Sequence, residues 1–167
     1  GTYATGANFT KAGLQNAILR SIEVKAGHFG DADLTRADFS DAEAQGANFA
    51  RATLTDAKFR AAELQAANLS RVDARGADFR DADMTAANLG GSRFQKASFR
   101  SADLRHANLS HSDFSGADLR DADLSWASIG GADLSGARGL TQDQLDEACA
   151  DNRTKVPAGL VAKACGN

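Results

Sequence analysis

The sequence predicts an all-β solenoid in which five-residue units stack four to a coil, closed at its C-terminal end by a short helix. Three observations support this fold class. A hydrophobic residue recurs every five positions, similar side chains recur every 20 positions, and residues 140–167 break both patterns. A period of five fits neither the 3.6-residue period of a helix nor the two-residue period of a plain strand. It fits a short extended segment followed by a corner.

The hydrophobic residue of each unit falls on a residue number that ends in 4 or 9. Of the 26 such positions from Phe9 to Leu134, 24 hold Phe, Leu, Ile, Val or Met, and Ala44 and Ala74 fill the other two. All nine Phe of the chain belong to this set. Two residues before them, 21 of the 26 positions hold Ala. Because side chains alternate along extended chain, the small and large residues both point inward and the residue between them faces solvent.

Side chains 20 residues apart are similar, which indicates that four units complete one coil. We name four of these rows. The acidic ladder is Glu23, Glu43, Glu63, Asp83, Asp103 and Asp123. The asparagine ladder is Asn8, Asn48, Asn68, Asn88 and Asn108, interrupted by His28. The arginine ladder is Arg20, Arg60, Arg80, Arg100 and Arg120, interrupted by Ser40. The inward phenylalanine column is Phe39, Phe59, Phe79 and Phe99. Stacked rings and amides of this kind stabilise a core column and amide ladders.

These units resemble those of the pentapeptide repeat family, whose motif is A(D/N)LXX. The units at residues 32–36, 77–81 and 117–121 match this motif directly, and the resemblance covers roughly residues 2–139. It implies a right-handed quadrilateral parallel β-helix of about seven coils, each of four pentapeptides. We expect residues 1–139 to form the β-helix and residues 140–167 to form a helix and tail that cap it. Residues 1–19 match the motif less well, so we expect a ragged first coil.

The segment after Gly139 carries the signals that start a helix. Thr141 and Gln144 stand at the N-cap and N3 positions of a capping box, and Leu140 and Leu145 stand at the hydrophobic-staple positions. We expect a helix over roughly residues 142–150 that covers the exposed edge of the last coil. The alternative is a dimerisation module, as in the family members that inhibit DNA gyrase. The protein is then either a monomer or a C-terminally mediated dimer.

Composition and cysteine content limit the cellular setting. The net charge of −3 argues against direct binding of nucleic acid. No apolar run approaches the ~20 residues that a membrane span needs, so we expect no membrane insertion. No secretory signal is visible, and we expect a cytoplasmic protein. Cys149 and Cys165 could form a disulfide, but in the cytoplasm we expect a reduced pair.

Motifs for catalysis, metal binding or cofactor binding do not stand out. The run Ser110, His111, Ser112 and Asp113 contains triad residue types, but neighbours in sequence do not form a nucleophile–base–orienter geometry. His106 and His111 fall at different corners of one coil, so we expect no metal site. The arginine ladder has acids two residues earlier, as Asp78 has to Arg80, which favours surface ion pairs over a phosphate track. We therefore expect no enzyme activity and no cofactor.

The charge of each face is more informative than the net charge. On the face of the acidic ladder, six acids stand against Lys25 and Arg105, a net charge of −4. We expect this ladder to bind a protein partner of unknown identity, in a non-enzymatic structural or protein-interaction module. The resemblance implies one alternative, a DNA-mimicking inhibitor or protector of DNA gyrase of the quinolone-resistance type, with a topoisomerase as partner. The ladder offers one charge per ~4.8 Å, sparser than the one per ~1.7 Å of B-DNA.

Overall fold

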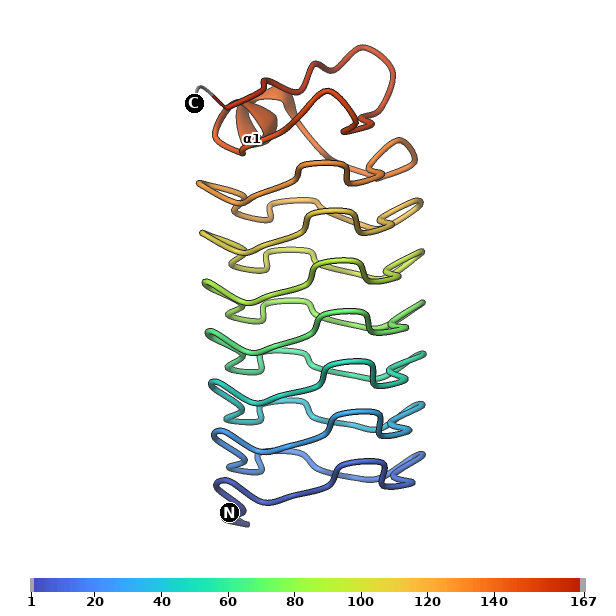
Figure 1. Cartoon of the computed structure of the whole chain (residues 1–167), viewed down its shortest axis with the longest axis vertical. Helices are drawn as coiled ribbons and strands as arrows, with labels where there is room; N and C mark the ends of the chain where they lie inside the picture. Colours follow the sequence, from blue (N-terminus) through green and yellow to red (C-terminus); the bar gives the residue numbers. More distant parts are fainter. Residues whose placement is uncertain (1, 166–167) are drawn as a thin grey trace.

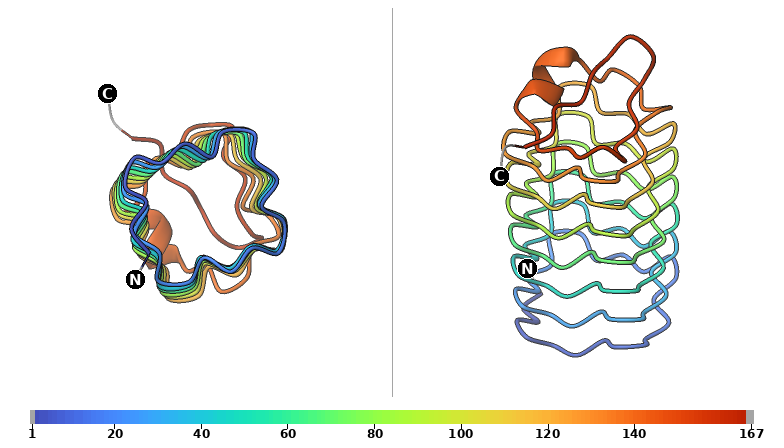
Figure 2. Two further views of the ribbon diagram at one scale, coloured as in Figure 1. Left: turned by 90° about the horizontal axis from the view of Figure 1, so that it is seen from below. Right: turned by 45° about the horizontal axis from the view of Figure 1, so that its top comes forward.

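The chain forms a straight stack of coils with one short helix, α1 (Gln142–Asp146), at its C-terminal end (Figure 1). The structure is a computed structural model that describes residues 2–165. Viewed along the stack, the coils have a four-sided outline (Figure 2, left). Each side contributes one residue to a parallel bridge with the residue 20 positions later, from Tyr3–Glu23 to Asp118–Arg138. The predicted parallel β-helix is therefore present. Within residues 2–165 its sides are single-residue bridges, and no longer strand occurs.

A tight turn forms each corner of the coil. In a typical unit the Ala37 N–H donates to the carbonyl of Leu34 at 2.9 Å, and the third residue of this turn, Arg36, has φ +56°. A positive φ at that position is the mark of a type II turn, which usually carries Gly or Asn. Non-glycine residues accept this conformation here because the neighbouring coil holds them. The Arg36 N–H, for example, donates to the carbonyl of Thr55 at 2.9 Å.

The turn also explains why Asp or Asn follows the small residue in the repeat. The N–H of Thr35 has no backbone acceptor, and Asp33 Oδ1 accepts its hydrogen bond at 3.0 Å. Asn48 Oδ1 does the same for the Ala50 N–H at 3.0 Å. Short carboxylates and amides commonly satisfy a backbone donor two residues later. The second repeat position is therefore a capping position as well as a surface position.

Stacked aromatic rings fill the centre of the rod. The rings of the phenylalanine column lie parallel, with centroids 5.0 Å apart for Phe39–Phe59, 5.2 Å for Phe59–Phe79 and 5.0 Å for Phe79–Phe99. All four side chains are fully buried. A second column starts at Phe9 and meets the first edge-on, as in the Phe39–Phe49 pair at 5.8 Å. Each ring therefore contacts neighbours in its own coil and in adjacent coils, so stability depends on coil-to-coil stacking.

The first coil is regular, and the expectation of a ragged start was wrong. Tyr3, Asn8, Gly13 and Ile18 all form parallel bridges to the second coil. The backbone N–H and C=O groups make these bridges, so a weak match to the side-chain motif does not prevent them. The Phe9 ring stacks on the second coil like those above it.

Helix α1 is shorter than the predicted 142–150. It begins as expected, because Thr141 and Gln144 form both hydrogen bonds of the capping box. Leu145, within the helix, has a fully buried side chain. It ends at Asp146 because the following backbone returns to the coil. Cys149 pairs with Ser128, and its N–H donates to the carbonyl of Ala127 at 2.8 Å. The carbonyls of Glu147 and Cys149 also accept N–H groups of the last coil, from Trp126 at 2.8 Å and Ile129 at 2.7 Å, so this segment follows the coil instead of the helix.

The tail continues over the open end of the last coil (Figure 2). Lys155 pairs with Asp133, and Ala150 pairs with Ala164. The second of these bridges places Cys149 and Cys165 side by side, with Cα atoms 5.2 Å apart, and they form a disulfide. The expected reduced pair was therefore wrong. Two cysteines 16 residues apart give no such signal, because the tail's return path decides their distance. We call residues 140–165 the cap.

Candidate functional site

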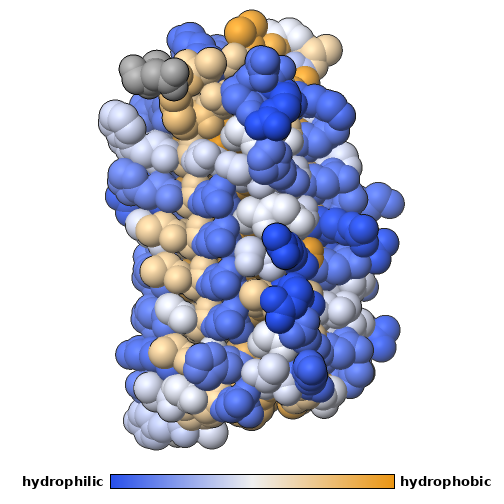
Figure 3. Space-filling view, viewed as in Figure 1, coloured by the Kyte–Doolittle hydropathy of each residue, from blue (hydrophilic) through white to orange (hydrophobic). Residues whose placement is uncertain are grey.

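The acidic ladder forms one continuous outward row along the rod. Each member bridges to the next, from Glu23–Glu43 to Asp103–Asp123, so the carboxylates recur once per coil. Glu63 and Asp123 are exposed and the other four are half-buried. The surface shows such rows as hydrophilic stripes that run along the stack (Figure 3). The geometry thus aligns six like charges on one rigid face.

The ladder has two chemically different halves. Asp83, Asp103 and Asp123 each use Oδ1 to accept the N–H of the turn residue two positions later, at 2.9–3.1 Å. Glu23, Glu43 and Glu63 make no such bond among the described residues. Their longer side chains place the carboxylate beyond the turn. The aspartates therefore also hold the fold, whereas the glutamate carboxylates make no hydrogen bond to the turn of their own unit. The sequence did not separate these two roles.

One cation at each end of the ladder offsets half of the negative charge there, and the centre has no cation. Lys25 Nζ lies 3.7 Å from Glu23 and 2.7 Å from Glu43. Arg105 lies 2.5 Å from Asp103 and 3.7 Å from Asp123. Between these pairs the ladder has neutral donors only: the Gln45 amide donates to Glu63, and the Gln65 amide donates to Asp83 at 2.7 Å. Glu63 and Asp83 carry the charge that no cation in the described chain pairs.

The paired groups stay ionised at neutral pH. The hydrogen bond from the Arg105 guanidinium lowers the pKa of Asp103, and the hydrogen bond to Glu43 raises the pKa of Lys25. Both shifts move the pKa away from neutrality. Asp103 and Lys25 therefore keep their charges at neutral pH.

The arginine ladder is neutralised by acids on the same face. Arg80 lies 2.5 Å from Asp78, and Arg20 lies 3.6 Å from Asp41 in the next coil. Arg60 and Arg100 pair across coils in the same way as Arg20. These exposed ion pairs leave no row of free guanidinium groups that could follow a phosphate backbone.

The asparagine ladder is made of hydrogen-bonded pairs. Asn68 donates its amide to Asn48 at 3.2 Å, and Asn108 donates to Asn88 at 3.1 Å. The Oδ1 atoms of these residues also accept turn N–H groups, as seen for Asn48. This ladder is a structural element of the coil.

The triad-like run near Ser112 has a structural explanation. The Ser112 hydroxyl is buried and donates to the carbonyl of Leu89 at 2.8 Å. Asp113 accepts the Gln95 amide at 2.6 Å and the Ser115 N–H at 2.9 Å. None of these contacts joins a nucleophile to a histidine base. Across residues 2–165 no group of three or more His, Cys, Asp or Glu could hold a metal ion.

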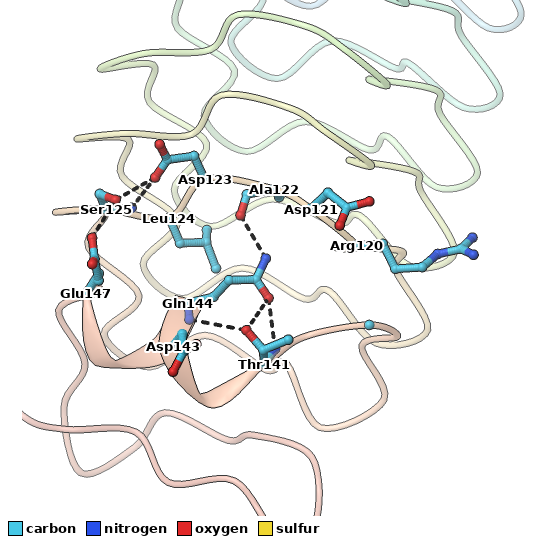
Figure 4. A pocket seen from close by; sticks show the side chains of 11 residues that line it. Arg120, Asp121, Ala122, Asp123, Leu124, Ser125, Thr141, Asp143, Gln144 and Glu147 are labelled. Atoms are coloured by element: carbon cyan, nitrogen blue, oxygen red, sulfur yellow. Dashed lines mark hydrogen bonds between the residues drawn. The ribbon is translucent and has the colours of Figure 1, made fainter.

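At the C-terminal end of the acidic ladder, a groove lies between the last coil and α1 (Figure 4). We call this space of about 430 Å³ the cap groove. On one wall Ser125 Oγ lies 2.5 Å from Asp123 Oδ1 and 2.7 Å from Glu147 Oε2, and its single proton donates to one of these carboxylates at a time. The opposite wall belongs to the helix, where the Gln144 amide donates to the carbonyl of Ala122 at 2.7 Å. The amide thereby replaces the backbone donor that a further coil would supply.

Sequence reasoning missed the cap groove and the exposed Trp126 beside it. Both depend on where the cap lies on the last coil, and the repeat pattern carries no information about that. One signal was available in the sequence: the only Trp of the chain occupies a turn position, outside the inward positions that hold every Phe.

No helix in the described part of the chain is long and apolar enough to cross a membrane.

Comparisons with known proteins agree with the fold. A family model described as pentapeptide repeats matches residues 32–71, 62–100 and 97–136, with eight copies. The structure is similar to that of HetL, a pentapeptide repeat protein involved in heterocyst differentiation regulation from the cyanobacterium Nostoc sp. strain PCC 7120. The TM-score is 0.83 at 30% identity, and the match covers 92% of this chain and 70% of HetL.

Other similar structures are more distant. AT2G44920, a pentapeptide repeat protein from the Arabidopsis thaliana thylakoid lumen, is 27% identical with a TM-score of 0.50, and the match covers 84% of this chain and 83% of that chain. QnrB1, a plasmid-mediated fluoroquinolone resistance protein, is 23% identical over 94% of this chain and 90% of its own, with a TM-score of 0.39. A comparison with curated proteins gave no match. With eight repeat copies that span residues 32–136 and the likeness to HetL, the chain belongs to the pentapeptide repeat family.

Proposed function

We propose that the chain is a non-enzymatic rod that binds a protein partner through the acidic ladder. The observation that carries this proposal is the uncompensated centre of the ladder, where Glu63 and Asp83 accept hydrogen bonds from neutral donors only. Charges of one sign on a rigid surface steer and orient a partner of opposite charge. The partner is therefore a protein with a basic surface. The coils are rigid enough to present this row without a folding cost on binding.

The likeness to HetL supports a regulatory role without chemistry. HetL is described as involved in the regulation of heterocyst differentiation, and it shares the coil architecture at a TM-score of 0.83. A regulator of this shape acts through contacts on its faces. We infer the same mode of action for this chain, with its own partner.

DNA mimicry with a topoisomerase as partner is the second candidate. The regular carboxylate row favours it, because such a row resembles one strand of phosphates in its regularity and sign. Two features weigh against it. The row offers one charge per ~4.8 Å, against one per ~1.7 Å in B-DNA. In addition, Lys25 and Arg105 each offset half of the charge at one end of the ladder.

Affinity capture with a charge-neutralised ladder tests the first proposal. The test variant is Glu43→Gln, Glu63→Gln and Asp83→Asn. The control variant removes the same charge from exposed turn positions outside the ladder and the cap groove: Asp31→Asn, Asp41→Asn and Asp56→Asn. We expect a lysate of the native host to yield a basic partner with the wild type and the control, and to lose it with the test variant. Equal capture by both variants would contradict a role for the ladder.

A supercoiling assay separates the two candidates. A DNA mimic inhibits gyrase at micromolar concentration or below, and neutralising Glu63 and Asp83 abolishes the inhibition. We expect no inhibition by the wild type. Inhibition that follows the ladder charge would replace the first proposal with the second.

A further inference from the structure

The chain's only tryptophan stands exposed at the junction between the last coil and the cap. Trp126 is 74% exposed, although it is a large aromatic residue. It occupies a turn position with φ +62°, and its N–H donates to the carbonyl of Glu147 at 2.8 Å. This hydrogen bond joins the turn to the first residue after α1. The backbone beneath the ring is therefore held on both sides, and the ring projects from a rigid base.

Two hollows lie near the tryptophan. Trp126 itself lines the tail pocket, our name for a second pocket of about 290 Å³ that is also lined by Ala148 and the Cys149–Cys165 disulfide. The cap groove is lined by Ser125, the residue before the tryptophan, and by Leu124. Glu147 lines both spaces, so the residue that fixes the tryptophan backbone also connects the two hollows. An exposed aromatic ring beside a concave surface suits an interface anchor, since such anchors pack in desolvated pockets.

The charge around the tryptophan favours a cationic partner. Four carboxylates line the cap groove: Asp121, Asp123, Asp143 and Glu147. Each hollow also has one cation in its lining, Arg120 in the cap groove and Lys163 in the tail pocket, and an acid already pairs with each of them. Arg120 donates to Asp118 on the neighbouring face, and Lys163 pairs with Asp146 at 2.8 Å. Within the described residues, Asp143 and Glu147 have no cationic partner.

We propose that Trp126 and Glu147 form the centre of a docking site for an arginine- or lysine-rich segment of a partner protein. A guanidinium or ammonium group lies over the indole face, where the ring quadrupole attracts it. Neighbouring basic side chains enter the cap groove and meet its carboxylates. The site rests on the proposed function, because it places the strongest contact at the upper end of the acidic ladder. Small exposed aromatic anchors of this kind carry most of the affinity of an interface.

Tryptophan fluorescence tests the contact directly, since the chain holds a single tryptophan. A short synthetic arginine-rich peptide is the probe, and a glutamate-rich peptide of the same length is its control. We expect the arginine-rich peptide to change the emission of Trp126 saturably and the glutamate-rich peptide to leave it unchanged. Binding of the arginine-rich peptide without any emission change would overturn the proposal. An emission change on neutral phosphatidylcholine vesicles, with none on the peptide, would also overturn it.

Affinity measured with a labelled copy of the arginine-rich peptide tests the energetics. We expect Trp126→Ala and Glu147→Gln each to weaken binding about tenfold, and Trp126→Phe to recover part of the loss. The matched controls are Tyr3→Ala, which removes an aromatic side chain that is 78% exposed at the other end, and Asp56→Asn, which removes an exposed acid from another face. Equal losses in the test and control variants would show a nonspecific charge effect and refute the site.

The ladder variant distinguishes this inference from the proposed function. If Glu63→Gln with Asp83→Asn leaves peptide affinity intact while Trp126→Ala lowers it, the docking site stands and the ladder's role as the partner surface fails. If the ladder variant lowers affinity and Trp126→Ala does not, the ladder stands and the docking site fails. Losses in both support a surface that runs from the ladder into the cap.

Discussion

The hydroxyl of Ser92 accepts a hydrogen bond from the backbone N–H of Val72, 20 residues earlier, at 3.1 Å. The same hydroxyl donates to the carbonyl of Leu69 at 2.8 Å, so it lies inside a turn of the coil below. Where no serine hydroxyl lies between them, the turn N–H donates directly to the carbonyl three residues earlier, as the Ala52 N–H does to Phe49 at 2.9 Å. The buried hydroxyl is thus fully satisfied, and the serine replaces a direct turn bond with a bridged one.

This arrangement predicts opposite outcomes for two substitutions of Ser92. Ser92→Ala allows the Val72 N–H to close on Leu69, as in the alanine units, so we expect a change in the free energy of unfolding below about 1 kcal/mol. Ser92→Val adds volume to a packed core position and removes the bridge, and we expect a loss of about 1–3 kcal/mol. Urea denaturation followed by circular dichroism measures both. A larger loss of unfolding free energy in the alanine variant would mean that the Val72 N–H does not form the direct hydrogen bond to Leu69.

The phenylalanine column predicts strong sensitivity at Phe79. This ring stacks on Phe59 and Phe99 and is fully buried. We expect Phe79→Ala to cost about 3–5 kcal/mol, and Phe79→Asp to cost more because it buries an unpaired charge. Thermal melts compare both with the exposed control Tyr3→Ala, for which we expect no change. An unchanged melting temperature in Phe79→Asp would refute the inward column.

The ion pair between Asp118 and Arg120 predicts acid-dependent stability. Hydrogen bonds from the Arg120 guanidinium lower the pKa of Asp118 from 3.8 to about 2. The folded state therefore favours the ionised carboxylate. Its contribution to stability is complete above pH 3.8 and is lost as the pH falls toward 2. Arg120 is about half exposed, so we expect a contribution of only about 1–2 kcal/mol.

Comparison with Asp118→Asn isolates this effect. We expect the wild type to be more stable than the variant at pH 6, with the difference shrinking between pH 4 and 2. Denaturation at a series of pH values measures it, and carboxyl chemical shifts in NMR report the pKa of Asp118 directly. A difference that is the same at pH 6 and pH 2 would show that the variant acts through packing instead of charge.

The disulfide predicts that reduction affects the cap and spares the coils. Cys149 and Cys165 close a loop of 16 residues, and such a loop contributes about 3 kcal/mol to the structure that it closes. We expect reduction, or Cys165→Ser, to make trypsin sites at Arg153 and Lys155 accessible. Mass spectrometry of limited digests identifies the cut sites. Early cleavage inside residues 22–121 in the reduced protein would contradict the prediction that the coils stay folded when the cap is loosened.

Most of the fold could be predicted from the repeat pattern of the sequence. A coil buries one small and one large side chain per unit, and every side repeats the same backbone geometry, so period and register follow from residue spacing alone. The predicted column from Phe39 to Phe99 and the start of α1 at the Thr141 capping box rest on such local rules. The same rules indicated that acids pair with the arginine ladder, as Asp78 does with Arg80.

The features that the sequence did not predict correctly depend on contacts between different segments of the chain. The sequence overestimated the length of α1 because Cys149 pairs with Ser128 of the last coil, and helix propensity contains no information about that pairing. It missed the disulfide because the Ala150–Ala164 bridge sets the approach of the two cysteines. It treated Glu63 and Asp83 as equivalent, although only the aspartate is short enough to accept its turn N–H.

The sequence by itself determined a five-residue period, a 20-residue coil, an inward phenylalanine column and one face with a charge of −4. These properties depend on spacing along one chain, which the sequence contains in full. The tertiary structure decided which charges remain unpaired on that face, and how the cap forms a pocket beside Trp126. These properties depend on the path of the cap over the last coil and on the reach of individual side chains, which no repeat pattern encodes.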